Sequence, residues 1–586
     1  SVVAVRALTA VLTALAAAAL AWAVGRALSL PAGWLVPLCL VATPTWFLHA
    51  RTGFEAPMAV AFFMFFLAFG LVFLAGAARA LAPALLAAAL SFYAYAPARL
   101  VVPLTAVALA LAWLASPTKT RANAMAVGFL LLVSLLPYLR FVSTFPQEQG
   151  RQLAVLGSFW AQEQPLGVAL SQALASYLAA WSPRFWLDPS HHLARHAVPG
   201  YGQLQGSLVP LVLLGGVVAL WRAWRGPQMA GYRFLLLSLL CAPAAALLLS
   251  PGVTRQLFLV PLLAVLAAVG GSALLGVRSS WVKRALTTLL AFGVVALAGR
   301  MAVRGMVEGP PLEQDYGFYG LQWGAQEVFS EVRFQLERNP GLAVALSPNW
   351  ANGTEELASF FLPDMGRLRW TSYQEMASRR QDWLSHALVG LPAEEFERLR
   401  QDRKFTKPHL CTVLFFPNGK PAFFFFRVGY SGQAEALFAA DAEARRRPVQ
   451  AEVVVGEERW LVVHPQLDMG PITNAFDGNP NTLIRTLEAN PLRVEVQFAQ
   501  GRWLAGVRLR VGAAPTAVRV LSANGGWRQV AQASFSASRD TRTVEVPFAP
   551  LLVQRVAVEV ANSGEGEPSH VHLWELQWLY IKERLP

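Results

Sequence analysis

The hydrophobic pattern divides the chain into two parts that meet near residue 300. Before this point apolar runs follow one another with short polar breaks. After it, apolar and polar residues alternate as they do in strands and amphipathic helices. A bilayer core of about 30 Å needs about 20 apolar residues per helix. The pattern therefore predicts a multi-pass α-helical membrane domain over residues 1–300, followed by domains that contain β-structure.

About ten apolar runs in the first part are candidates for membrane helices. They cover residues 7–25, 33–49, 57–77, 80–95, 97–115, 121–138, 207–222, 233–250, 256–275 and 283–300. Residues 147–178 are read instead as an amphipathic helix that lies on the membrane surface. The composition agrees with a membrane protein, because 55% of the residues are hydrophobic, 15% are charged and the mean hydropathy is +0.41.

Basic residues predict the orientation of these helices. If the helices alternate in direction, one side of the membrane receives most of the basic loop residues, namely Arg26, Arg79, Lys119, Arg121, Arg222, Arg225, Arg233, Arg278, Lys283 and Arg284. The positive-inside rule makes this side cytoplasmic. We therefore expect a cell-membrane protein whose C-terminal domains are extracellular or periplasmic. The first helix then starts outside, which leads us to expect a further helix and external loop upstream of Ser1.

The same basic loops explain the formal net charge of +13, since anionic lipid headgroups attract them. No basic motif interleaved with aromatic residues is present, so nucleic acid is not an expected partner. Cys39, Cys241 and Cys411 give neither a disulfide framework nor a zinc spacing.

Arg51 and Arg99 break the charge bias, because both fall on the predicted outer side. A charge at the membrane face has to be stabilised, and an anionic ligand is one candidate for this. The alternative is that both side chains extend to the lipid headgroups.

The stretch FWLDPSHHLARHAVPGYGQL (185–204) concentrates three histidines between two apolar regions. His192 and His196 would share the face of a helix and, with His191 or Asp188, give a metal site. The prolines of the stretch leave room for only a short helix. The other two interpretations are a loop over a ligand cavity and a solvated loop between helices.

Four blocks of the first part resemble, in order, the bacterial multi-pass GT-C glycosyltransferases related to protein O-mannosyltransferases and the lipid A aminoarabinose transferase. The blocks are RALTAVLTALAAAALAWAVGRAL, PTWFLHARTGFEAPMAVAFFMFFLAF, LLAAALSFYAYAPARLVVPL and WSPRFWLDPSHHLARHAVPGYGQL. The resemblance implies transfer of a sugar from a polyprenyl-phosphate donor to a protein or lipid hydroxyl at the outer face. It also implies a divalent metal in some members, and an acidic residue that acts as the catalytic base in a first external loop, which we expect upstream of Ser1.

On this resemblance, arginines hold the lipid phosphate through bidentate hydrogen bonds that lysine makes less well. The candidate residues for the donor phosphate and the cavity are Arg51, Glu55, Arg99, His192, Arg195 and His196. Glu55 would orient Arg51 or an acceptor rather than act as the base.

After residue 300 the pattern predicts a small α/β domain over 309–440 and an all-β domain over 451–581. NAFDGNPNTLIRT and the ending HVHLWELQWL resemble the discoidin (F5/8 type C) β-sandwich, whose members bind glycans through loops at one end. The resemblance implies a structural calcium ion at Asp477, Asn479, Thr482 and Glu575. The alternative is a turn held by its own Asx hydrogen bonds without an ion. Ile484 stands where the family has tryptophan.

For glycan contacts, Trp503, Trp527, His570 and His572 are available, although aromatic residues of a sandwich are more often core. The sequence thus predicts a membrane glycosyltransferase with an external glycan-binding module, or a non-catalytic membrane anchor that displays this module. A transporter fits less well, because paired broken helices and repeat symmetry are not evident.

Overall fold

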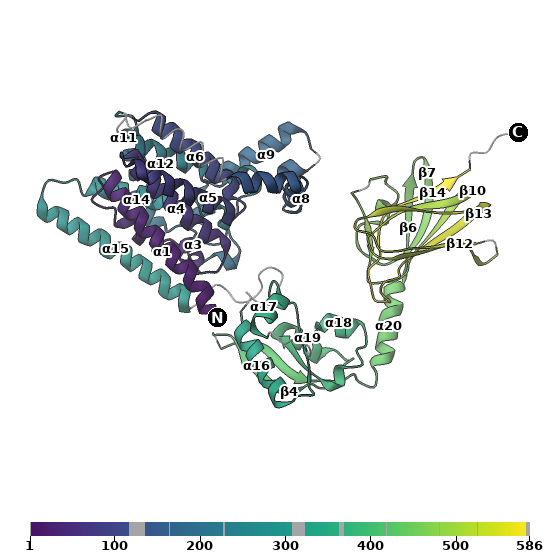
Figure 1. Cartoon of the computed structure of the whole chain (residues 1–586). Helices are drawn as coiled ribbons and strands as arrows, with labels where there is room; N and C mark the ends of the chain where they lie inside the picture. Colours follow the sequence, from purple (N-terminus) through teal and green to yellow (C-terminus); the bar gives the residue numbers. More distant parts are fainter. Residues whose placement is uncertain are drawn as a thin grey trace. The chain divides into compact units, whose positions relative to one another are not determined.

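The computed structural model describes residues 2–116, 135–162, 164–226, 229–307, 323–362, 368–417, 419–479, 481–523 and 525–581. The chain divides into two compact units, Ser1–Leu321 and Gln322–Pro586. In the described residues the first unit consists of helices, whereas the second contains two sheets (Figure 1). The predicted fold class, an apolar helical part followed by an α/β domain and a β-sandwich, is confirmed.

The helical unit contains long apolar helices and several short connecting ones. The described helices are α1 (Val2–Ala27), α2 (Leu35–Val41), α3 (Pro44–His49), α4 (Glu55–Leu74), α5 (Leu81–Ala94), α6 (Ala98–Leu114), α8 (Glu148–Val155), α9 (Leu166–Ala179), α10 (Pro183–Leu187), α11 (Val209–Ala223), α12 (Ala230–Cys241), α13 (Val253–Gln256), α14 (Leu259–Leu274) and α15 (Ser280–Val307).

Five helical segments of the described chain are long and apolar enough to cross a membrane. They are Arg6–Ala27, Glu55–Leu74, Gly206–Ala223, Ala230–Leu247 and Ser280–Val307. Shorter apolar helices cover Ala78–Ala94, Ala98–Leu114, Leu166–Ala179 and Leu259–Leu274. The predicted span over 121–138 lies largely outside the described residues.

The predicted span over 33–49 is instead two short helices, α2 and α3. Thr43 has extended backbone (φ −89°, ψ 116°) directly before Pro44, because a residue that precedes proline disfavours the helical region. The break leaves the carbonyl of Ala42 free to accept a hydrogen bond of 2.6 Å from Nε2 of Gln205. The broken helix therefore holds the loop that contains Gln205.

The amphipathic helix predicted over 147–178 is also divided, into α8 and α9. Gly157 has a left-handed φ of +72° between them, and Pro165 precedes α9 with extended backbone. Neither residue favours a continuous helix here.

Glycines let α11 and α14 approach each other closely. A Cβ on Gly215 would lie 1.8 Å from the carbonyl oxygen of Leu266, and one on Gly270 would lie 2.2 Å from that of Leu211. Small residues at such contacts are typical of membrane helices, which pack without a hydrophobic driving force between them. Any side chain at these two positions would push the helices apart.

The α/β domain is built on a sheet of order β2-β1-β3-β5-β4, in which β2, β1 and β3 are parallel and β5 is antiparallel to both neighbours. Its elements are α16 (Ala325–Arg338), β1 (Ala343–Leu346), α17 (Thr354–Phe361), β2 (Leu368–Trp370), α18 (Tyr373–Ser378), β3 (Ala387–Pro392), α19 (Ala393–Gln401), β4 (His409–Phe415) and β5 (Pro421–Arg427).

A buried carboxylate connects the segments that follow the three parallel strands. Glu395 accepts hydrogen bonds from Ser347 Oγ at 2.6 Å, Asn349 Nδ2 at 3.3 Å and the Tyr373 N–H at 2.6 Å. Burial raises the pKa of Glu395, although these three donors act in the opposite direction. Both carboxylate oxygens of Glu395 accept hydrogen bonds from protein groups, so this residue has a structural role.

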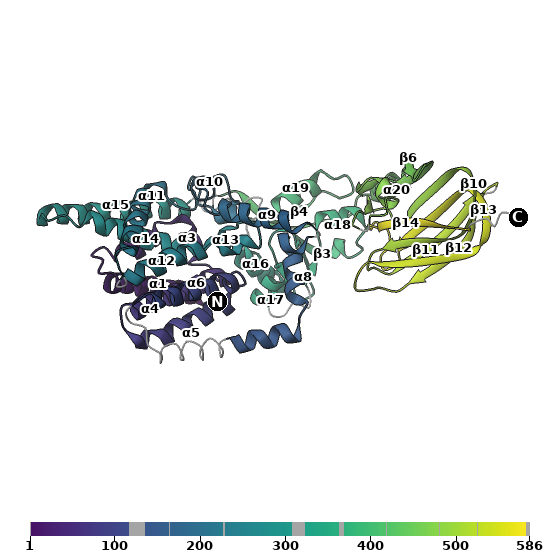
Figure 2. The same cartoon turned by 90° about the horizontal axis from the view of Figure 1, so that it is seen from above.

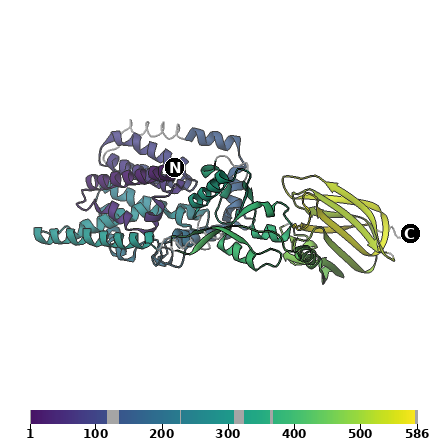
Figure 3. The same cartoon turned by 90° about the horizontal axis from the view of Figure 1, so that it is seen from below.

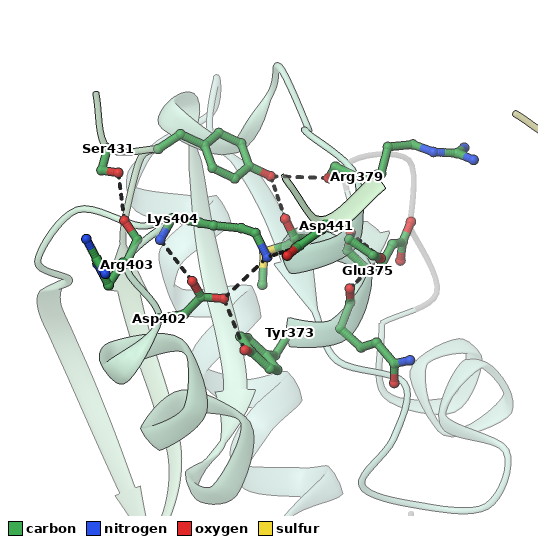
Figure 4. A network of polar contacts seen from close by, with 12 residues as sticks. Tyr373, Glu375, Arg379, Asp402, Arg403, Lys404, Ser431 and Asp441 are labelled. Atoms are coloured by element: carbon green, nitrogen blue, oxygen red, sulfur yellow. Dashed lines mark hydrogen bonds and ion pairs between the residues drawn. The ribbon is translucent and has the colours of Figure 1, made fainter. Parts of the chain in front are cut away.

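Helix α20 (Ala434–Arg446) is attached to the α/β domain by a polar network (Figure 4). Lys404 Nζ lies 2.6 Å from the Asp441 carboxylate on α20 and 4.0 Å from that of Asp402. The Tyr373 hydroxyl donates to Asp402 at 3.1 Å. Burial, together with this carboxylate, raises the pKa of Tyr373 to about 12, so the hydroxyl remains a donor at neutral pH.

The β-sandwich forms one hydrophobic core beneath a strongly bent sheet. Its strands are β6 (Pro448–Val455), β7 (Glu458–Pro465), β8 (Leu467–Met469), β9 (Ile484–Thr486), β10 (Leu492–Val511), β11 (Thr516–Ala523), β12 (Trp527–Phe535), β13 (Arg542–Asn562) and β14 (His572–Tyr580). The main path is β12-β11-β13-β10-β14-β9-β8, and β7 pairs with β10 and β6. Figure 2 shows the sandwich in yellow from above and Figure 3 from below.

Register shifts explain how two long strands bend around this core. The pairing of β10 with β13 shifts between Gln497 and Arg502 and again between Leu504 and Gly506, and such irregularities bend a strand. Ile484 is fully buried in the core. It occupies the position where the discoidin resemblance implies tryptophan.

Candidate functional site

Four connecting segments meet at one end of the helical unit, which we call the polar end: residues 43–55, 95–99, 185–205 and 250–256. The Thr45 N–H donates to the Gln203 carbonyl at 3.3 Å, and the Tyr95 hydroxyl donates to Thr254 Oγ1 at 3.2 Å. Gly305 of α15 lies against Phe47 and Val198. The connections that follow α3, α5 and α10 therefore lie at the same end of the helices.

The opposite end carries the basic loop residues between α11 and α12. Arg233 donates to the carbonyls of Ala223 at 2.9 Å and Gly226 at 3.1 Å, and Arg222 donates to the Tyr232 hydroxyl at 2.5 Å. The hydrogen bonds of these arginines thus stabilise the connection between α11 and α12. Which of the two ends faces the cytoplasm stays a prediction.

At the polar end, hydrogen bonds connect Thr45, His49, His196 and Arg195 in series. His49 Nδ1 lies 2.7 Å from the Thr45 carbonyl oxygen, and His49 Nε2 lies 3.1 Å from His196 Nδ1. Arg195 Nε donates to His196 Nε2 at 3.3 Å. A carbonyl can only accept, so His49 carries a proton on Nδ1.

Two buried acceptors lie beside this chain. Thr45 Oγ1 and Gln203 Oε1 have no hydrogen-bond partner within the described residues. Both residues are almost fully buried, with 1% of their surface exposed. Buried polar atoms normally find a partner, so these two favour a bound hydroxyl or water at this position.

The candidate residues Arg51 and Glu55 lie on the connection between α3 and α4. The Arg51 guanidinium stacks on the Phe47 ring, 3.9 Å from its centroid, while Glu55 is exposed and opens α4. Because Phe47 also touches Gly305, which contacts Val198, Arg51 lies near the loop that carries Arg195 and His196.

Arg99 lies in the first turn of α6 at the same end. Its guanidinium lies 5.9 Å from the centroid of the Tyr138 ring, and its Nε is buried without a hydrogen-bond partner in the part of the chain that the structure describes. Gln256 on α13 is fully buried, and both of its amide atoms lack partners among the described residues. Arg99 and Gln256 thus each have an unused donor that suits an anionic or hydroxylated ligand.

His192 does not join His196. Its Nε2 lies 2.6 Å from the Phe185 carbonyl oxygen, and its ring packs edge-on against Phe185 with centroids 4.6 Å apart. Asp188 accepts from the backbone and side chain of Ser190, which lowers the pKa of Asp188. No three His, Cys, Asp or Glu side chains in the described residues could hold a metal ion together. The two histidines of the HxxxH spacing thus have separate partners.

In the sandwich, the structure brings together the four residues that the discoidin resemblance implies for calcium. Thr482 Oγ1 donates to the Asp477 carboxylate, at 2.8 Å from Oδ2, and the Asn479 N–H donates to Asp477 Oδ1 at 2.8 Å. The Gly478 N–H donates to Glu575 Oε2 at 3.1 Å. Burial, followed by the charge of Asp477, raises the pKa of Glu575.

These contacts fit both interpretations of the turn. Two carboxylates that repel each other, with amide and hydroxyl oxygens nearby, suit a hard cation. The Asx hydrogen bonds at Asp477 and at Asn479 also hold the turn without an ion. Arg510 is paired with Glu575 in the β10–β14 register.

A cavity of about 370 Å³ opens at one end of the sandwich. Its lining includes Thr516, Asn562, Glu565, His570, His572 and Trp574. The His572 ring stacks on Trp574 with centroids 6.1 Å apart, and burial lowers the pKa of His572. Trp527 lies elsewhere, beneath the guanidinium of Arg493 at 4.7 Å, and neither Trp527 nor Trp503 lines this cavity.

No protein-family model and no curated protein matches the chain. Several solved structures match a fifth of it. The family 32 carbohydrate-binding module of Clostridium perfringens NanJ, in complex with galactose, is 18% identical and aligns over 20% of this chain and 92% of that chain, with a TM-score of 0.18. Chitosan-binding module 1 of a Paenibacillus chitosanase/glucanase is 20% identical over 20% and 92% of the two chains, with a TM-score of 0.17.

The C-terminal domain of a chitobiase from Bacteroides fragilis is 14% identical over 21% of this chain and 95% of that chain, with a TM-score of 0.18. These modules are similar in fold to the C-terminal β-sandwich. The resemblance of the helical unit to GT-C glycosyltransferases stays a prediction.

Proposed function

We propose that this protein is a membrane glycosyltransferase that moves a sugar from a polyprenyl-phosphate donor to a protein, lipid or glycan acceptor at the outer membrane face. The observation that carries the proposal is the polar end, where Arg51, Arg99 and Arg195 come from three separate connections between apolar helices. Guanidinium groups at a membrane face match the oxygens of a lipid phosphate.

The external sandwich would hold an acceptor glycan in the cavity beside His572 and Trp574. A ring platform next to hydrogen-bonding side chains suits a sugar, which offers an apolar face and several hydroxyl groups. Asp477, Asn479, Thr482 and Glu575 would hold a calcium ion that fixes the neighbouring turn.

A second candidate function is a non-catalytic membrane anchor that displays this glycan-binding sandwich. The cavity favours it, because all of the residues that line it belong to the sandwich and none to the helical unit. Glycan binding without sugar transfer would support this second function.

The test uses the full chain in lipid vesicles supplied with radiolabelled polyprenyl-phosphate hexoses and pentoses, and it follows the release of polyprenyl phosphate. Arg99→Ala removes hydrogen bonds to a charged group, each worth about 1.5–3 kcal/mol, and should lower transfer roughly tenfold to hundredfold. Arg79→Ala, at the basic end, is the matched control and should transfer normally. Equal activity in both variants would remove Arg99 from the donor site.

A further inference from the structure

One loop of the sandwich, residues 563–570, forms part of the cavity beside Trp574, and we call it the cavity loop. Glu565 and His570 of this loop line the cavity. Glu565 is the one acidic residue among the described residues of the lining, which include no lysine or arginine. A negative charge without a compensating cation repels an anionic ligand. The lining therefore suits a neutral sugar better than a uronic acid.

Within the sandwich, the side chain of Asn490 holds both ends of the cavity loop. Its Nδ2 lies 2.9 Å from the carbonyl oxygens of Asn562 and Glu565 and 2.9 Å from Ser569 Oγ. The Asn562 N–H donates to Asn490 Oδ1 at 3.1 Å. Asn490 is 8% exposed, so these hydrogen bonds are shielded from water and fix the two ends of the loop.

The α/β domain holds the middle of the cavity loop. Arg379, which directly follows α18, donates from Nη2 to the Gly566 carbonyl at 2.9 Å. Gln374 of α18 donates to the Glu488 carboxylate at 3.2 Å, and the Glu488 carbonyl accepts a hydrogen bond from the Ser569 N–H at 3.2 Å. The region of α18 therefore reaches the loop directly through Arg379 and indirectly through Glu488.

The cavity loop also carries a nearly buried carboxylate. The Glu567 side chain is 9% exposed and forms an ion pair with Arg446 of α20, while Arg445 Nε lies 3.8 Å from its other carboxylate oxygen. A buried charge that loses its partners is strongly unfavourable, so these cations hold Glu567 in place. Because this part of the loop lies between Glu565 and His570, a displacement here moves the wall of the cavity.

We propose that the α/β domain and α20 position the cavity loop for the binding of a neutral sugar. Glu565 is then the specificity-determining residue, and Arg379 and Glu567 are positioning residues. This inference rests on the glycan binding of the proposed function. It makes the α/β domain part of the glycan-binding unit rather than only a connection to the helical unit.

The experiment presents the full chain, in phospholipid nanodiscs at about pH 8, where unperturbed imidazoles are neutral, with an array of neutral oligosaccharides and the corresponding uronic acids. The neutral sugar that binds most strongly is then used to measure Kd. Arg379→Ala removes a hydrogen bond from a charged donor and lowers the population of the positioned loop, so Kd should rise about threefold to tenfold. Arg379→Lys keeps a charged donor and should retain more affinity. Hydrogen exchange of residues 563–570 should increase in Arg379→Ala, whereas exchange in β10 should not change.

Two further variants test specificity and provide the control. Glu565→Gln should reduce the preference for the neutral sugar over its uronic acid roughly fivefold, because one charge repulsion is lost. Arg369→Ala should bind like the wild type, since this exposed arginine lies over the Trp383 ring within the α/β domain.

An unchanged Kd in Arg379→Ala, or a wild-type protein that prefers uronic acids, would overturn the inference while glycan binding itself stands. A wild-type protein that binds none of the arrayed sugars would instead overturn the glycan-binding part of the proposed function, and the inference with it.

Discussion

Calcium binding at the turn of Asp477 and Glu575 gives a prediction that can be worked out from the structure. Burial and the neighbouring carboxylate raise the pKa of Glu575. A carboxyl group whose pKa is raised in the folded state contributes stability at pH values below its unfolded-state pKa. This stability is lost as pH rises through the folded-state pKa. Without calcium, the sandwich should therefore become less stable as pH rises just above the ordinary range of glutamate.

Calcium should reverse this dependence, because it binds the deprotonated carboxylate. An ion at 100 times its Kd stabilises the folded state by about 2.7 kcal/mol. Calcium sites of extracellular modules have Kd values of about 10⁻⁴–10⁻³ M, so roughly 10 mM calcium is required at the stronger limit. For a domain of this size the shift in Tm should be roughly 10 °C.

Glu575→Gln should remove both the dependence of stability on pH and the stabilisation by calcium. The variant should be more stable than the wild type at neutral pH without calcium, because a charge repulsion is gone, and it should not respond to calcium. Hydrogen exchange in β14 and in residues 477–482 of the full chain, with calcium or with EDTA, measures both. A wild-type protein that is unaffected by 10 mM calcium (roughly 100 Kd at the stronger limit) would refute the ion and favour the turn held by its own hydrogen bonds.

Three other variants test the packing. Gly215→Val should destabilise the helical unit by about 1–3 kcal/mol in a detergent melt, because of the backbone contact with α14, whereas Gly216→Val meets open space and should not. Glu395→Gln should cost about 1.5–3 kcal/mol at pH 5, measured by exchange at Tyr373. The cost should shrink toward pH 8 because the raised pKa of Glu395 makes its stabilisation fall as pH rises. Lys404→Met leaves Asp402 and Asp441 without their cation and should increase exchange in α20, while Lys407→Met, at an exposed position, should not.

The order of the domains was predictable from the sequence, because the spacing of apolar residues within a short segment indicates which of its side chains are buried. Pro44 also indicated a break in the helix. We nevertheless predicted one continuous span over 33–49, because the residues around this proline form a long apolar run. His49 could not be found in this way, because its partner His196 lies 147 residues further along the chain. A single histidine in an apolar run gives no signal of such a contact.

The sequence grouped Arg51, Arg99, Arg195 and His196 by their predicted side of the membrane. The detailed geometry of that end depends on contacts between distant loops, such as the one between Thr45 and Gln203. His192 illustrates the limit: its spacing from His196 suggested a shared ligand, whereas the Phe185 carbonyl occupies its ring nitrogen.

The interruption between α2 and α3 determines how a substitution at Pro44 would affect the loop that contains Gln205. Gln205 is secured by an acceptor that exists only because the helix is discontinuous at Ala42. Replacing Pro44 by a good helix former would allow α2 and α3 to form one continuous helix. The Ala42 carbonyl would then accept a hydrogen bond within this helix. A mutation that improves local helix propensity would thus remove one of the contacts that hold the histidine-bearing loop.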